Sequence, residues 1–231
     1  MTNKLTFTIL ILCFLGSQLK SQVSIETDSF KFWQPNLKLS IADFKQDTNE
    51  GTAIKYKEKI GLLAGCGVSV VRYLDVPKKK KNQGKMLEIA YFVPIWNKYQ
   101  SYIFTNDSMV IEKQKLYFDI AEMICRMARK DIDSLQNSTK SYGRLYFEYV
   151  NIANHYCSKF SEFHREYTQA VFVRKEENAF SLWRSVTDKK LLELETYATK
   201  PLDCERILTK QPVEKDYKLS PTIYGQLMKC N

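Results

Sequence analysis

Histidine and cysteine are the side chains with which proteins most often bind metals or carry out nucleophilic chemistry at neutral pH. This chain of 231 residues has two histidines and six cysteines. His155 and His164 are nine residues apart in a segment with helical periodicity. Nine residues turn a helix by about 900°, equivalent to about 180°. The two imidazoles should therefore leave opposite sides of that helix, where they cannot share a metal ion.

Pairs of cysteine with histidine fit catalysis no better. His155 and Cys157 have a spacing that does not share a helix face. Cys157 and His164 do share a face, but roughly 10 Å of helix axis separates them, which is too far for a nucleophile and its base. The sequence also has no C-x-x-C pair, G-x-S-x-G elbow, P-loop or Rossmann glycine pattern. We therefore predict no catalytic residue, metal or cofactor from these motifs.

The positive charge of the chain is concentrated in one short loop. The net charge is +9, and an excess of this kind can indicate nucleic-acid binding. The only dense run, however, lies beside Pro77 and Gly84 between two apolar segments, as a hairpin loop does. We interpret it as a solvated loop that does not bind nucleic acid; in an exported protein it could attract an anionic envelope surface. Its lysines are Lys78, Lys79, Lys80, Lys81 and Lys85.

Residues 1–21 are predicted to be a signal peptide. Met1–Lys4 is polar and positively charged, and Leu5–Gly16 is an apolar run that suits a signal sequence but is too short to span a bilayer. Ser17–Gln22 turns small and polar, which places cleavage near Ser21. We expect the rest of the chain, residues 22–231, to be exported to the periplasm or the extracellular space as a single mixed α/β domain without a transmembrane segment.

Five cysteines remain after this cleavage, so they cannot all pair within one chain. Export permits disulfides, and Cys204 with Cys230 could tie the Pro-containing tail to itself. The sequence alone leaves the connectivity open. The five are Cys66, Cys125, Cys157, Cys204 and Cys230.

The first half of the mature chain has strand patterns, over residues 30–103. Alternation at Leu37, Leu39 and Ile41 predicts a half-buried strand within Phe30–Lys45, and Ala53–Ile60 also alternates. Two runs rich in β-branched and aromatic residues flank the lysine loop and predict an antiparallel pair, in which Pro94 marks a strand end or a sheet edge. These runs are Gly65–Val76 and Met86–Trp96.

The second half has the period of helices, over residues 107–197. The first helix should begin after an N-cap at Asp107 or Ser108 and end near Leu135. A break at Asn137–Gly143 precedes a second helix with a continuous apolar stripe from Leu145 to Tyr167. A third is expected over about 175–197, followed by an irregular tail at 198–231. The predicted fold class is α+β, with amino-terminal antiparallel strands packed against a carboxy-terminal bundle of about three long helices.

The first long helix carries a resemblance to a known family. Its segment Phe118–Glu122 (FDIAE), followed by Arg126, is similar to a helix in a secreted bacterial family of zinc-dependent proteases, the domain of unknown function 922 family. There, an HExxH motif runs directly into such a segment. Upstream, Trp33, Leu39, Asp43 and Phe44 resemble the first strand of the same family, and AYFVPIW with SYI, over 90–103, resembles a later one. The helix around Trp183 falls at the place of a family Gln-x-x-Trp helix.

The resemblance implies a zincin-like scaffold, but the residues that would bind zinc are replaced. Two histidines four residues apart bind the metal in this motif, and the glutamate between them acts as the base. Lys113, Gln114 and Tyr117 stand at these positions, and Gln169 stands where a later histidine is expected. An ammonium group cannot ligate zinc while protonated, an amide is not a base at neutral pH, and a phenol is a poor zinc ligand. No catalytic or metal-binding role therefore transfers.

Three functions remain open. The chain could be an exported, catalytically inactive relative of these proteases that acts as a binding or structural module for an unknown protein or envelope component. Lys113 and Tyr117 would then occupy the former metal cleft, with the ammonium in place of the ion and paired with a carboxylate, or both would merely solvate the helix face. Alternatively, the chain is a hydrolase with unrelated catalytic residues, or a basic protein that binds the envelope surface.

Overall fold

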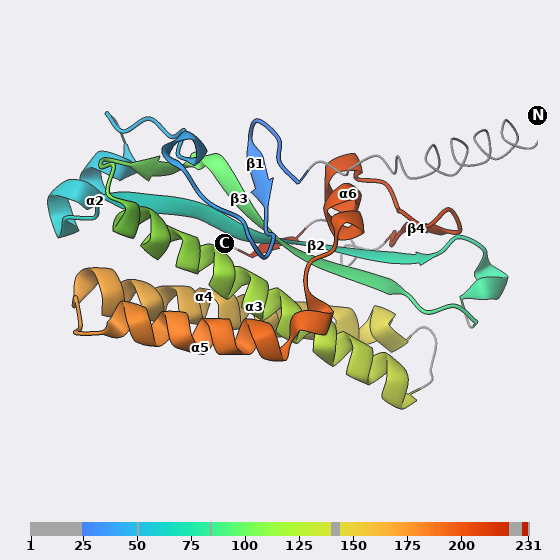
Figure 1. The fold of residues 1–231 in the computed structure, drawn as a ribbon. Helices are drawn as coiled ribbons and strands as arrows, with labels where there is room; N and C mark the ends of the chain where they lie inside the picture. The colour runs from blue at the N-terminus through green and yellow to red at the C-terminus, as the bar shows by residue number, and fades with distance from the viewer. Residues whose placement is uncertain (1–24, 50, 84, 140–143, 222–227, 231) are drawn as a thin grey trace, which may run out of the picture.

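A long antiparallel hairpin forms the centre of the structure, with three long helices on one of its faces (Figure 1). The computed structural model describes residues 25–49, 51–83, 85–139, 144–221 and 228–230. The predicted signal peptide and residues 140–143 of the predicted break at 137–143 therefore lie outside the described residues, while residues 137–139 of that break are helical. Within them, no helix is both long enough and apolar enough to cross a membrane.

The hairpin consists of β2 (Ala64–Pro77) and β3 (Ile89–Ile103). Its register pairs Asp75 with Ile89 at the lysine loop and Ala64 with Ile103 at the other end, so the predicted antiparallel pair is confirmed. Period-two alternation divides the side chains of β2 between two cores. One core, on the side of the long helices, contains Val68, Val70, Leu74 and Val76, and the other contains Val71 and Tyr73.

Three short strands complete the sheet. β1 (Phe30–Phe32) pairs with β3, while β4 (Tyr217–Leu219) and β5 (Met228–Cys230) both pair with β2, giving the order β1-β3-β2-β4 with β5 beside β2. Pairing of β1 ends at Ile95 of β3. Pro94 is the next residue of β3 and does not pair with β1. Its lack of an N–H group therefore costs no hydrogen bond to that strand.

The three predicted long helices are present as α3 (Ser108–Thr139), α4 (Arg144–Thr168) and α5 (Ala179–Glu193). The carboxylate of Asp107 accepts the N–H of Met109 at 2.8 Å, which confirms the predicted N-cap. A five-residue π-helix, Gln169–Val173, extends α4. The buried stripes of α3 and α4 form the larger core with the sheet.

Two further helices correct the prediction of about three. α2 (Thr52–Ile60) replaces the strand predicted at Ala53–Ile60. Gly61, in the left-handed conformation with φ 67°, ends this helix by donating its N–H to the carbonyls of Lys57 and Tyr56. The tail at 198–231 is not irregular, because it contains α6 (Pro201–Thr209), β4 and β5. α6 lies on the opposite face of the sheet from α3 (Figure 1).

The strand predicted within Phe30–Lys45 is also wrong beyond Phe32. After β1 the chain turns and forms a 3-10 helix at Ile41–Asp43. The buried ammonium of Lys31 donates to Asp43 at 2.8 Å, and the N–H of Ser40 donates to the same carboxylate at 2.8 Å. This long-range ion pair and cap bend the segment back over β1, which the local alternation could not indicate.

One disulfide is present among the described residues, and it is not the expected pair. Cys157 of α4 is bonded to Cys230 of β5, whereas Cys66, Cys125 and Cys204 are free. Cys204 packs in the second core, on the other face of the sheet from Cys230. The sheet therefore separates the two cysteines that sequence spacing suggested as partners.

Reduction of this disulfide should lower the free energy of unfolding by about 2–4 kcal/mol, because the bond closes a long loop; its cysteines are 73 positions apart. Urea unfolding with and without a thiol reductant measures the change. A variant with both Cys157→Ser and Cys230→Ser should start at the lower stability and be insensitive to the reductant. Equal stability of the wild-type protein in both conditions would contradict the pairing.

Candidate functional site

Three of the four positions aligned with the zinc ligands and the catalytic glutamate of the family line one cavity. Gln114 and Tyr117 come from α3, and Gln169 begins the π-helix that follows α4. The first residues of β2 and the end of β3 close the other side. The cavity measures about 660 Å³, within the range of about 300–1,000 Å³ typical of sites for small molecules.

The cavity is uncharged. None of the described residues that line it is Asp, Glu, Lys or Arg, although these make up 26% of the chain. Its polar groups are amides, hydroxyls, one thiol and one imidazole. We refer to it as the neutral cavity.

Tyr117 is fixed by its neighbours and does not point a free hydroxyl into the cavity. Its hydroxyl donates to Thr168 at 2.7 Å, and the Thr168 hydroxyl donates to the carbonyl of His164 at 2.7 Å. The ring packs against His164, Tyr167 and Phe172. Burial raises the pKa of Tyr117 far above its usual value, so the phenol stays neutral and cannot act as a phenolate ligand.

Gln114 and Tyr102 line the cavity, and each has a buried polar atom without a partner. The amide nitrogen of Gln114 donates to the carbonyl of Ala64 at 3.3 Å, while its oxygen has no partner among the described residues. The hydroxyl of Tyr102 likewise has none. Both side chains are almost fully buried, with 1% and 5% exposed. Burial raises the pKa of Tyr102 to about 12, so its hydroxyl remains a hydrogen-bond donor.

His164 also lines the neutral cavity, on the opposite side of α4 from the exposed His155, as the spacing predicted. Its ring lies 4.2 Å from that of Tyr117 and 5.6 Å from that of Phe160. Burial lowers the pKa of His164 from 6.5 to about 4. The imidazole is therefore neutral at pH 7, with one donor and one acceptor nitrogen.

This pKa predicts an acid-sensitive stability. Between pH 6.5 and about 4 the unfolded chain binds a proton at His164 that the folded chain does not, so the free energy of unfolding should fall across this window. The loss is at most about 3 kcal/mol and is absent above pH 6.5. The neighbouring Tyr117 and Cys66 stay neutral here, because burial raises both pKa values. Unfolding curves at several pH values should show a weaker dependence for His164→Gln, and an unchanged one for the control His155→Gln.

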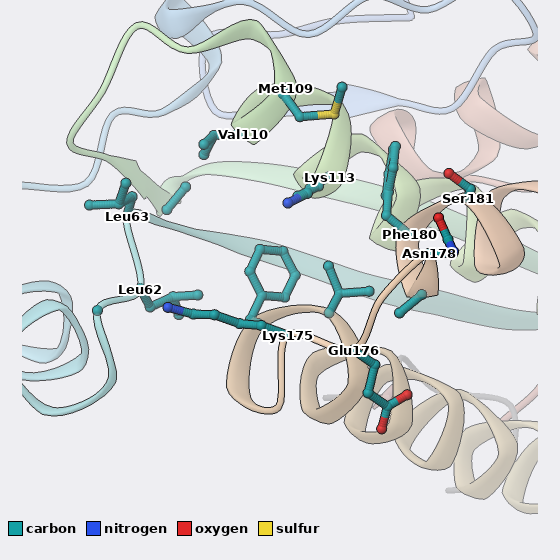
Figure 2. A pocket seen from close by; sticks show the side chains of 15 residues that line it. Leu62, Leu63, Met109, Val110, Lys113, Lys175, Glu176, Asn178, Phe180 and Ser181 are labelled. Carbon is teal, nitrogen blue, oxygen red and sulfur yellow. The ribbon is translucent and has the colours of Figure 1, made fainter.

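Lys113 lies in a second cavity that adjoins the first. This cavity measures about 520 Å³ and shares Leu62 and Ala64 with the neutral cavity. Figure 2 shows Lys113 extending from α3 and Lys175 extending from the segment before α5, both into this space. No described carboxylate lies within ion-pair distance of Lys113, so the expected pairing of its ammonium group with a carboxylate is not formed.

The FDIAE segment itself lies in a buried ionic network and not in the cavity. Asp119 accepts hydrogen bonds from Trp33 at 2.8 Å and from Arg184 of α5 at 2.5 Å. Glu122 accepts from Arg126 at 2.8 Å and from the N–H of Thr199 at 2.9 Å. Asp119 therefore links α3 to Trp33, directly after β1, and to α5. Glu122 links α3 to Thr199, shortly before α6.

The lysine loop lies far from the neutral cavity. Lys78, Lys79, Lys80, Lys81 and Lys85 are exposed at the turn between β2 and β3. The cavity is at the other end of the same hairpin, roughly 40 Å away for a strand of this length. The two predicted sites are therefore separate.

Sequence patterns missed Tyr102, Cys66 and His164 as cavity residues. The strand around Cys66 was predicted, but the predicted run Met86–Trp96 stops before Tyr102, which lies in β3. No local pattern reports that these side chains face a helix terminus 50 or more positions further on. One signal was available, since Gly65 and Gly67 flank Cys66. An added Cβ at Gly65 would lie 2.5 Å from the Tyr102 ring, and glycine in a strand often marks such a close approach.

The residues at the replaced zinc positions do not fit a metal ion. They are an ammonium, two amides and a phenol with a raised pKa. Across the part of the chain that the structure describes, no three His, Cys, Asp or Glu side chains come together as a metal site would require. Comparison with known proteins finds no matching family model, no matching curated protein and no matching solved structure.

Proposed function

We propose that this chain is an exported, non-catalytic binding protein related to secreted zinc proteases, and that it binds its partner molecule in the neutral cavity. The observation that carries the proposal is that Gln114, Tyr117 and Gln169 converge on one cavity of about 660 Å³ whose described lining residues carry amides and hydroxyls. Pockets of this size with a few convergent polar groups are the usual form of small-molecule sites.

Two features support export. The amino-terminal sequence has the polar start and short apolar run of a signal peptide. The Cys157–Cys230 bond is of the type that persists in oxidising compartments. The partner is then a component of the envelope or of the extracellular medium.

The hydrolase alternative has one candidate pair, since Cys66 and His164 line the same cavity. A cysteine nucleophile needs a thiolate, usually stabilised by an imidazolium or another cation. Burial raises the pKa of the Cys66 thiol and lowers that of His164, so both groups are neutral at pH 7. This electrostatic environment favours binding over nucleophilic attack.

The envelope-surface alternative depends on the lysine loop and can be tested separately. Replacing the five loop lysines with glutamine should weaken any salt-dependent association with anionic vesicles, and should leave binding in the distant neutral cavity unchanged. Vesicle binding that persists in the variant would remove the loop from that role.

A fragment screen combined with metal analysis tests the proposed function. We expect crystals of the mature protein soaked with a chemically diverse fragment set to show fragments in the neutral cavity. We also expect less than one zinc per chain in the purified protein. One tightly bound zinc per chain, or peptide hydrolysis that is lost in Cys66→Ala or His164→Gln, would overturn the proposal.

A further inference from the structure

We infer that the second cavity, into which Lys113 extends, binds an amphipathic carboxylate, meaning a ligand with one carboxylate group on an apolar body. This inference goes beyond the proposed function, because it assigns a ligand to a cavity that the proposed function does not use. It is carried by two ammonium groups in the cavity, by the lack of an available carboxylate among the described lining residues, and by apolar walls.

Two ammonium groups give the second cavity a positive charge. Lys113 on α3 and Lys175 before α5 extend into the same space from two different elements (Figure 2). Glu176 is the only acidic residue among the described residues that line this cavity. Its carboxylate pairs with Arg174, and in Figure 2 it points away from both lysines. No described lining side chain therefore neutralises the two ammonium groups.

Comparison with two other enclosed lysines shows what Lys113 lacks. The buried ammonium group of Lys31 pairs with Asp43, and that of Lys115, two residues further along α3, pairs with Asp119. Lys113 is also partly buried, but no described carboxylate lies within ion-pair distance of it. A carboxylate on a ligand would supply this counter-charge, and partial exclusion of water strengthens such a pair.

The backbone at Lys175 has an unusual conformation. Its φ is 51°, in the left-handed region where glycine is the usual residue after a helix. Two hydrogen bonds fix this turn, from the N–H of Arg174 to the carbonyl of Gln169 at 2.8 Å and from the N–H of Glu176 to the carbonyl of Ala170 at 2.9 Å. Glycine would fit this backbone better, so a role for the ammonium group gives a reason for a lysine here.

The walls of the second cavity are mainly apolar. Leu63 and Met109 leave 42% and 49% of their surface exposed beside it, and exposed apolar surface next to a pocket often marks a binding site. A hydrocarbon body would cover this surface, whereas a small hydrated anion would leave it in contact with water. The apolar wall residues include Leu62, Leu63, Met109, Val110, Phe172 and Phe180.

Calorimetry on the mature protein, with probes kept below micelle-forming concentrations, tests the inference. Decanoate has both the carboxylate and the apolar body; decanol lacks the charge, acetate lacks the body, and decylamine has the opposite charge. We expect decanoate to bind about tenfold or more tightly than each of these three, and its affinity to fall as salt is added. No binding of decanoate, or equal binding of any of the three, would overturn the inference. Tighter binding of decyl phosphate than of decanoate would overturn the carboxylate assignment.

Two variants locate the binding. Lys113→Met and Lys175→Gly each remove one ammonium group and should weaken decanoate binding by about tenfold. Lys130→Met is the matched control for the first variant, because Lys130 is an exposed lysine of the same helix that does not line the cavity; it should bind decanoate as the wild-type protein does. Unchanged decanoate affinity in Lys113→Met would overturn the inference.

Thermal unfolding distinguishes a binding role of Lys175 from a structural one. Glycine adopts the left-handed conformation without a steric penalty, so Lys175→Gly should lose decanoate affinity without a lower unfolding temperature. A variant that loses stability and keeps its affinity would contradict the binding role of Lys175.

The outcomes separate this inference from the proposed function. If fragments occupy the neutral cavity and decanoate does not bind, this inference is wrong and the proposed function stands. If decanoate binds through Lys113 while the neutral cavity takes no fragment, this inference stands and the proposed function is wrong. If neither cavity takes a ligand, both proposals fail.

Discussion

Replacing Glu122 with alanine is expected to lower the free energy of unfolding by about 3–5 kcal/mol, since one partner of a buried ionic network is removed. Glu122 is fully buried. Besides Arg126 and the N–H of Thr199, its carboxylate accepts the hydroxyl of Thr199 at 2.6 Å and lies 3.6 Å from Arg129. The variant would leave two guanidinium groups in the interior without this counter-charge.

Urea unfolding at pH 7 measures this loss. Glu112→Ala is a matched control on the same helix, because Glu112 is exposed, and it should change stability by less than about 0.5 kcal/mol. Glu122→Gln keeps an acceptor for Thr199 but removes the charge, so its loss should fall between the two. A Glu122→Ala variant as stable as the control would show that the network does not hold α3 to its neighbours.

This network gives the FDIAE segment a structural role that is independent of any chemistry in the cavity. Asp119 and Glu122 satisfy Trp33, Arg126 and Thr199 inside the protein, so their spacing is set by packing between elements. Gln114 and Tyr117 lie on the part of the same helix that faces the cavity. The residues that hold α3 to its neighbours and the residues that line the cavity are therefore separate sets on one helix.

The elements that the sequence predicted are those with strong local periodicity. The β2–β3 hairpin follows from alternating β-branched and aromatic residues around a lysine loop, and α3 and α4 follow from stripes that repeat at three and four residues. Asp107 could be identified as a cap because capping depends on neighbouring residues alone.

The elements that were missed depend on distant contacts. The chain after Phe32 turns because Lys31 pairs with Asp43 and not because of its alternation. The bond between Cys157 and Cys230 requires β5 to pair with β2 beside α4. The cavity likewise forms only when the end of β3 meets the π-helix after α4. The glycines at 65 and 67 signal a close approach in β2, but they do not name Tyr102 as the side chain that approaches.

Arg206→Met is expected to destabilise the protein by about 3–5 kcal/mol, because it leaves a buried carboxylate without its partner. The guanidinium of Arg206 forms two hydrogen bonds of 2.7 Å with Asp75 of β2, and neither residue is more than 1% exposed. The guanidinium carbon also lies 4.2 Å from the ring centre of Tyr73. This pair attaches α6 to the second face of the sheet.

A double variant distinguishes the net contribution of the ion pair to stability from the destabilisation caused by removing only one partner. Combining Arg206→Met with Asp75→Leu removes both charges and keeps the volume apolar, so most of the lost stability should return. Asp75→Leu alone should lower the free energy of unfolding as much as Arg206→Met, because it leaves the buried guanidinium without its carboxylate. The double-mutant cycle, measured by urea unfolding at pH 7, should therefore give a large coupling energy. Additive losses would mean that the two side chains contribute independently, and that apolar packing and not this ion pair holds α6 on the sheet.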